Sequence, residues 1–113
     1  RENFPEDANL EELLEIKRSV VALAKEVGPV YANSDHARAR ELTVEGRSIA
    51  KRCDKLVVRV AAGDYSANIA IALTLGARFF KRVEMHLLNV LSSVLMPLHK
   101  LDYFDEDVAS TKR

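Results

Sequence analysis

Glu41 and Glu45 are the pair of acidic residues whose spacing could support chemistry. They are four residues apart, so on a helix they share one face and could bind a hard cation together. Three arginines, Arg38, Arg40 and Arg47, lie around them in the sequence. An exposed acidic pair beside these arginines is the simpler interpretation, and we favour it over a metal site.

His86 and Asn89 are a second candidate pair, three residues apart on another predicted helix. His86 is three residues from Val83 and four from Val90, so it borders the apolar stripe of that helix. It could contact a metal or a ligand, but no second histidine follows at the spacing of three or four that metal-binding pairs use. We therefore favour a histidine at the core edge that hydrogen-bonds a neighbouring helix.

Cys53 is the single cysteine, which excludes an internal disulfide and is typical of a reducing, cytoplasmic setting. It lies on an apolar stripe with no histidine near it in sequence, so we expect a buried structural thiol and not a nucleophile. Gly46 and Gly76 also lie on apolar stripes. Because glycine costs about 1 kcal/mol relative to alanine inside a helix, we expect neighbouring helices to approach closely at both positions.

No nucleophile elbow, phosphate-binding loop, CxxC pair or catalytic triad spacing is present in the sequence. We therefore expect a protein that is not an enzyme. We also expect no cofactor, with a divalent metal as the disfavoured alternative at Glu41, Glu45 or His86.

Three long helices are predicted to position these residues, at 10–33, 35–62 and 66–97. Each has apolar residues at steps of three and four, the pattern of an amphipathic helix. The connections are short, so consecutive helices are expected to be antiparallel, which gives an all-α, up-down-up bundle of three helices. The expected core contains Leu13, Val20, Leu42, Ile49, Leu56, Leu73, Phe80, Leu87 and Val90.

The predicted helix ends follow from capping residues, glycine and proline. The candidate N-caps, in chain order, are Asp7 or Asn9, then residues 33–35, then Ser66. Gly28 and Pro29 either end the first helix or kink it, so that it runs on to about residue 33. Gly63 is placed to end the second helix, and Pro97 to kink or end the third.

The composition suits one folded helical domain, since 48% of the 113 residues are hydrophobic and 30% are charged. We expect a flexible lead-in at 1–9, the helical domain at 10–100 and a polar tail at 101–113.

Basic and acidic residues balance at 17 each, which gives no reason to expect nucleic acid as a partner. The longest uncharged stretches, 65–77 and 87–98, are shorter than the roughly 18 to 20 residues of a membrane-spanning helix. The chain starts without methionine, so we expect a piece of something longer.

Several apolar residues lie off the main stripes and are expected at a surface that a partner covers. They are Val44, Val57, Leu75, Phe79, Leu88, Leu91 and Leu95. A second copy of the chain, forming a homodimer of six helices, or another protein would fill that role.

Residues 81–90, KRVEMHLLNV, resemble the third-helix signature of the PhoU family. That signature reads Glu-Arg-Ile-Gly-Asp-His, two residues, then Asn-Ile. The matching or nearly matching positions are Arg82, Val83, His86, Asn89 and Val90. The stretch 34–62, with Ala37, Ala39 and Glu45 and with Gly63-Asp64 after it, resembles the family's second helix. The resemblance spans about residues 10–98, one three-helix repeat.

The resemblance implies a regulator of phosphate uptake that contacts a phosphate transporter and a sensor histidine kinase, without catalysis. Most family members carry two such repeats, and several bind metal clusters through helix carboxylates. Here Lys81 stands where the signature has Glu, and Met85 where it has Asp, so two of the metal-binding acids are missing. We therefore expect weak or no metal binding, and mainly structural roles for Arg82, His86 and Asn89.

Single PhoU-like repeats also occur attached to sodium–phosphate cotransporters and other membrane proteins. The expected location is accordingly the cytoplasm, with the inner face of the membrane, docked on or attached to a transporter, as a second possibility.

Two other functions compete with this one. A generic helical scaffold or oligomerisation module, unrelated to phosphate, is the first alternative. A metal-binding bundle of the ferritin-like type ranks last, because it needs Glu-x-x-His pairs on facing helices and the sequence has none.

Overall fold

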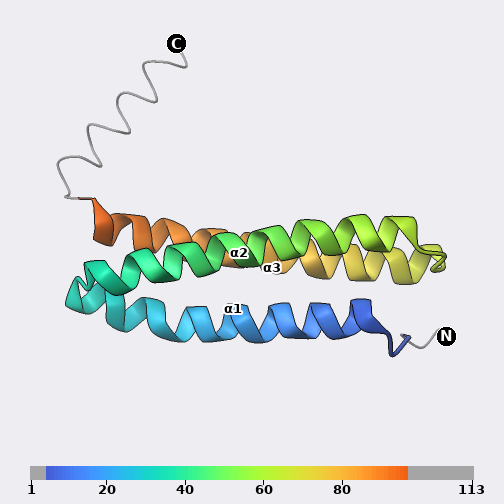
Figure 1. Ribbon diagram of the computed structural model, residues 1–113, viewed down its shortest axis with the longest axis horizontal. Helices are drawn as coiled ribbons and strands as arrows, with labels where there is room; N and C mark the ends of the chain where they lie inside the picture. Colours follow the sequence, from blue (N-terminus) through green and yellow to red (C-terminus); the bar gives the residue numbers. More distant parts are fainter. Residues whose placement is uncertain (1–4, 97–113) are drawn as a thin grey trace, which may run out of the picture.

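The computed structural model describes residues 5–96, which form three long helices and, within that range, no strand. They are α1 (Ala8–Asn33), α2 (His36–Ala62) and α3 (Ala67–Leu95). Consecutive helices run antiparallel, and each packs against the other two (Figure 1). This is the predicted up-down-up bundle. Residues 1–4 of the expected lead-in, Pro97 and the tail at 101–113 lie outside the described residues.

Each helix begins at a predicted cap, where a side-chain oxygen accepts hydrogen bonds from backbone N–H groups that have no helical partner. The Asp7 carboxylate accepts from the N–H groups of Asn9 and Leu10, at 3.1 and 3.0 Å. The Asp35 carboxylate accepts from Arg38 at 3.1 Å, and the Ser66 hydroxyl from Ile69 at 3.3 Å.

Pro29 lies inside α1, which continues to Asn33, so the predicted continuation to about residue 33 is confirmed. The residue before a proline is pushed out of the helical region partly by its own Cβ, which Gly28 lacks. The helix ends at Ser34, which has left-handed backbone angles, φ 50° and ψ 44°. At the other end of the chain, Met96 is extended and ends α3, as expected for a residue before proline.

The core lies along the axis between the three helices. Its buried apolar side chains are Ile16, Val20, Leu23, Val27, Val30, Ala39, Leu42, Ile49, Cys53, Leu56, Val60, Leu73, Ala77, Leu91 and Val94. Five predicted core residues, Val20, Leu42, Ile49, Leu56 and Leu73, are among them. Leu13, Phe80 and Leu87 are half-buried against this core.

The predicted inward face of α3 is wrong in part. Val90 was expected in the core but is 39% exposed, whereas Leu91 is fully buried. The buried line of α3 follows heptad steps through Ala77, Glu84 and Leu91. One residue corresponds to about 100° of rotation, so α3 is turned relative to the stripe read from the sequence.

The expected outer apolar set is wrong in part. On α3, the same rotation buries Leu91 and packs Leu88 and Leu95 against the core, and Val57 of α2 packs against the core as well. Val44, Leu75 and Phe79 are exposed as predicted.

Candidate functional site

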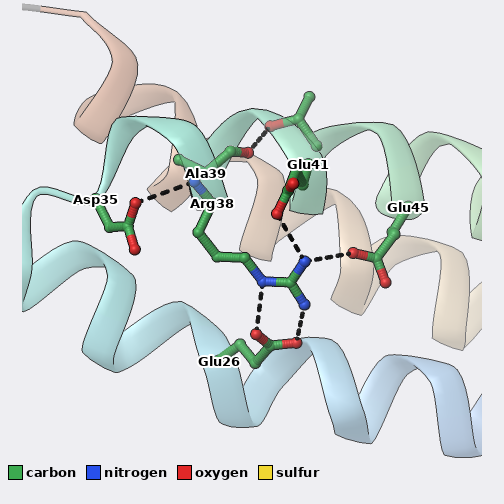
Figure 2. A network of polar contacts seen from close by, with 7 residues as sticks. Glu26, Asp35, Arg38, Ala39, Glu41 and Glu45 are labelled. Carbon is green, nitrogen blue, oxygen red and sulfur yellow. Dashed lines mark hydrogen bonds and ion pairs between the residues drawn. The ribbon is translucent and has the colours of Figure 1, made fainter.

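Glu41 and Glu45 do share a cation, but that cation is the guanidinium of Arg38. Arg38 lies 3.0 Å from Glu41 and 3.4 Å from Glu45, both on α2 (Figure 2). It also donates two hydrogen bonds to Glu26 of α1, at 2.8 and 2.6 Å. These contacts raise the pKa of Arg38 and lower that of Glu26. The cluster therefore joins α1 to α2 through one guanidinium group that three carboxylates surround.

The three candidate metal ligands do not form one site. Glu41 and Glu45 are engaged by Arg38, and His86 lies on the exposed surface of α3. Within residues 5–96, no three His, Cys, Asp or Glu side chains are grouped closely enough to hold a metal ion.

The residues of the PhoU-like signature lie mostly on the outside of the bundle. His86 and Asn89 are exposed, and neither forms a hydrogen bond with another described residue, so His86 is not the core-edge residue that the sequence suggested. Arg82 is also exposed. On α3 these three residues are separated by steps of four and three, so they share one face.

We call this surface the α3 outer face, and define it by Ile71, Leu75, Arg78, Phe79, Arg82 and His86. Its apolar members are unusually exposed, at 57% for Ile71, 63% for Leu75 and 60% for Phe79. Leu75, Arg78, Phe79, Arg82, Val83 and His86 line a shallow depression on it. The ring of Phe79 makes an edge-to-face contact with the ring of Phe80, and the ring centroids are 5.5 Å apart.

The α3 outer face combines apolar and basic character. Glu84 is the single acidic residue of α3, and it is buried. Lys81 is paired with Asp54 of α2 at 2.9 Å. Arg78 and Arg82 form no ion pair with any residue in the range 5–96. The face therefore offers two unpaired guanidinium groups beside exposed aliphatic and aromatic side chains.

Glu84 is the least expected residue of the bundle. It is 0% exposed, and neither carboxyl oxygen has a hydrogen-bond partner among residues 5–96. It faces Gly46 of α2, where a Cβ atom would lie 3.0 Å from Glu84 Oε2 and 2.5 Å from Leu88 Cδ2. The absence of a side chain at Gly46 gives Glu84 and Leu88 their space, which confirms the predicted close approach of helices there.

Burial raises the pKa of the Glu84 carboxyl to about 7, and the Lys81 charge opposes this only in part. On α2, the nearby titratable residues are Cys53 and Asp54. The buried residues of α1 are all apolar. Near neutral pH the carboxyl group can therefore gain or lose a proton inside the core.

Cys53 is buried beside this group, as predicted. Burial raises the pKa of its thiol to about 11, and the charges of Glu84 and Asp54 act in the same direction. The thiol therefore stays protonated at neutral pH and is a poor nucleophile.

The sequence contains a heptad spacing that includes the buried glutamate, but the predicted apolar stripe of α3 was one position away from it. Ala77, Glu84 and Leu91 are spaced by seven residues. A glycine on the facing helix, Gly46, leaves room for a long polar side chain in that line. The tertiary packing of α2 and α3 decides that Gly46 and Glu84 face each other.

Two further polar clusters join the helices. Arg52 of α2 donates two hydrogen bonds to Glu12 of α1, at 3.0 and 2.8 Å, which lower the Glu12 pKa. Near the α2–α3 connection, Tyr65 donates a hydrogen bond to Asp7 and accepts one from Asn9 at 3.0 Å. These contacts set the relative positions of the helices and leave the α3 outer face uncovered.

In the described part of the chain, no helix combines the length and apolar character needed to cross a membrane. No protein-family model, no curated protein and no solved structure matches this chain.

Proposed function

We propose that this chain is a PhoU-like regulatory domain that modulates phosphate uptake or phosphate signalling through contacts with other proteins. Its partner would be a component of a phosphate transporter or a sensor kinase, at the cytoplasmic side of the membrane. The other partner that we propose is a second copy of the chain or a second PhoU-like repeat.

The observation that carries the proposal is the position of the signature residues. Arg82, His86 and Asn89 match the PhoU pattern in order and spacing, and all three are exposed on α3. Beside them lie Leu75 and Phe79, whose large apolar side chains are more than half exposed. Exposed apolar residues next to arginines are typical of surfaces that bind proteins.

The proposal assigns no catalytic residue and no cofactor. Cys53 is buried as a neutral thiol, and Glu41 and Glu45 are engaged by Arg38. Lys81 and Met85 stand where the signature has acids. Elemental analysis of the purified protein should therefore find no stoichiometric iron, zinc or manganese, and finding one of these metals would contradict this part of the proposal.

The second candidate function is a helical oligomerisation module unrelated to phosphate. The same exposed residues, Ile71, Leu75 and Phe79, favour it, because an apolar helix face serves self-association equally well.

Deleting the coding region of this domain in its host separates the two functions. The regulatory proposal expects altered phosphate accumulation and altered expression of phosphate-starvation genes in phosphate-rich medium. If both stay at wild-type levels, the link to phosphate is wrong and the oligomerisation module takes its place.

A further inference from the structure

The α3 outer face suits an occupant with two chemical properties. Apolar side chains would cover its exposed apolar residues, and carboxylates would pair with Arg78 and Arg82, which form no ion pair within residues 5–96. Within residues 5–96, no other segment covers this face or pairs with these two arginines.

The chain itself contains a segment with both properties. Residues 101–107 read LDYFDED. The segment contains Leu101, Tyr103 and Phe104 together with four acidic residues. Those acids are Asp102, Asp105, Glu106 and Asp107. The segment begins six residues after Leu95, the last residue of α3. This short connection gives the segment a high effective concentration near the α3 outer face.

The length of the connection fits the distance to be covered. A helix rises ~1.5 Å per residue, so Phe79 lies about 26 Å back along α3 from Met96. An extended chain advances ~3.3 Å per residue, so Phe104 can lie up to about 26 Å from Met96. Met96 already has an extended conformation, and Pro97 follows it, so the chain leaves the helix at the point where it would have to turn back.

We propose that residues 101–107 dock on the α3 outer face of the same chain. The acidic side chains pair with Arg78 and Arg82, and Phe104 covers Phe79. The tail then occupies the surface that a partner protein would use, so a partner must displace it. Docking is independent of phosphate and can be tested without the proposed function.

A spin label on the tail of the full chain tests this directly. The label is attached through Val108→Cys. Labelling at neutral pH is selective for this position, because Cys53 is 1% exposed and burial raises its pKa to about 11. Amide NMR signals near Leu75 and Phe79 should lose intensity through proximity to the label, and those at the distant end of α1, residues 27–33, should not.

Charge reversal checks the pairing. The tail variant Asp105→Lys with Glu106→Lys changes no residue of α1, α2 or α3 and should restore the lost intensity. Arg78→Glu with Arg82→Glu should do the same, whereas Arg40→Glu with Arg47→Glu, a matched exposed pair on α2, should leave the effect unchanged. If the α3 double variant fails to fold, the tail variant still decides.

A mixed sample identifies the chain that supplies the tail. Isotope-labelled protein without the spin label is combined with spin-labelled protein of natural isotope abundance. Intensity loss in this mixture would show that the tail binds a second copy and would overturn docking within one chain. Intensity loss elsewhere on the bundle, or none at all, would overturn docking on the α3 outer face.

Discussion

The carboxyl group of Glu84 couples the charge of one residue to the stability of the whole bundle. Its pKa is about 7 in the folded protein, against an ordinary value of 4.5. Between these values the folded protein keeps a proton that the unfolded chain releases, so stability must fall as pH rises. The contribution is fully present below pH 4.5 and is lost as the pH passes 7. The loss amounts to roughly 3 kcal/mol, by the free energy of one pKa unit.

Urea denaturation at pH 5 and pH 8 should therefore give a lower midpoint at pH 8 for the native chain. Glu84→Gln removes the titration, so this variant should show little difference between the two pH values. The carboxylates of Asp7, Glu12 and Glu26 have lowered pKa values, and they affect stability only at more acidic pH. A native chain that is equally stable or more stable at pH 8 would show that Glu84 is not buried as described.

Gly46 is the residue that makes space for Glu84 and Leu88. Gly46→Ala places a Cβ 2.5 Å from Leu88 Cδ2. We expect a destabilisation of roughly 1–3 kcal/mol from overpacking, which exceeds the gain of about 1 kcal/mol in helix propensity. At Gly76 the nearest atom is Leu13 Cδ2 at 3.1 Å, so Gly76→Ala should cost less. Thermal unfolding of the two variants gives the comparison, and the opposite order would contradict the α2–α3 contact.

The helices themselves could be predicted closely from the sequence, because caps and apolar spacing agree. The predicted span of 35–62 differs from the observed α2, His36–Ala62, by one residue. The rotation of α3 could not be predicted as well, since that helix is apolar on two faces. Val90 and Leu91 are equally apolar by type, and only the packing of α1 and α2 decides which one is buried.

Four members of the α3 outer face could be named from the sequence, Leu75, Phe79, Arg82 and His86. Ile71, Arg78 and the arrangement of the face were not identified from it. The sequence identified His86 and Asn89 by type, and could not show that they face outward. It grouped Glu41 with Glu45 but not with Glu26, because that residue belongs to another helix and its approach to Arg38 depends on tertiary packing.

The end of α1 offers a test of the helix boundaries. Ser34 has φ 50°, a left-handed conformation that is strained for a residue with a Cβ. Ser34→Gly should therefore raise stability by about 1 kcal/mol. Ser48→Gly, at an exposed position inside α2, should lower stability by a few tenths to 1 kcal/mol instead. If thermal unfolding shows that both variants destabilise the protein, α1 does not end at Ser34 in the way described.

At the scale of the whole molecule, charge and apolar surface are unevenly distributed. The ion pairs of Arg38 and Arg52 engage arginine side chains with carboxylates between α1 and α2. The α3 outer face instead presents Arg78 and Arg82 unpaired within residues 5–96, beside exposed Phe79. This asymmetry is why we assign partner contacts to α3 and a structural role to the α1–α2 side.

Phosphate accumulation in host cells that carry outer-face variants tests the central claim most directly. Phe79→Asp with Arg82→Glu should change accumulation in phosphate-rich medium as strongly as deletion of the domain, because the partner contact is lost. Val58→Asp, at a position on α2 that is 68% exposed, should leave accumulation at the wild-type level. Wild-type accumulation in the outer-face variant, with the deletion showing a clear effect, would contradict a regulatory contact through α3.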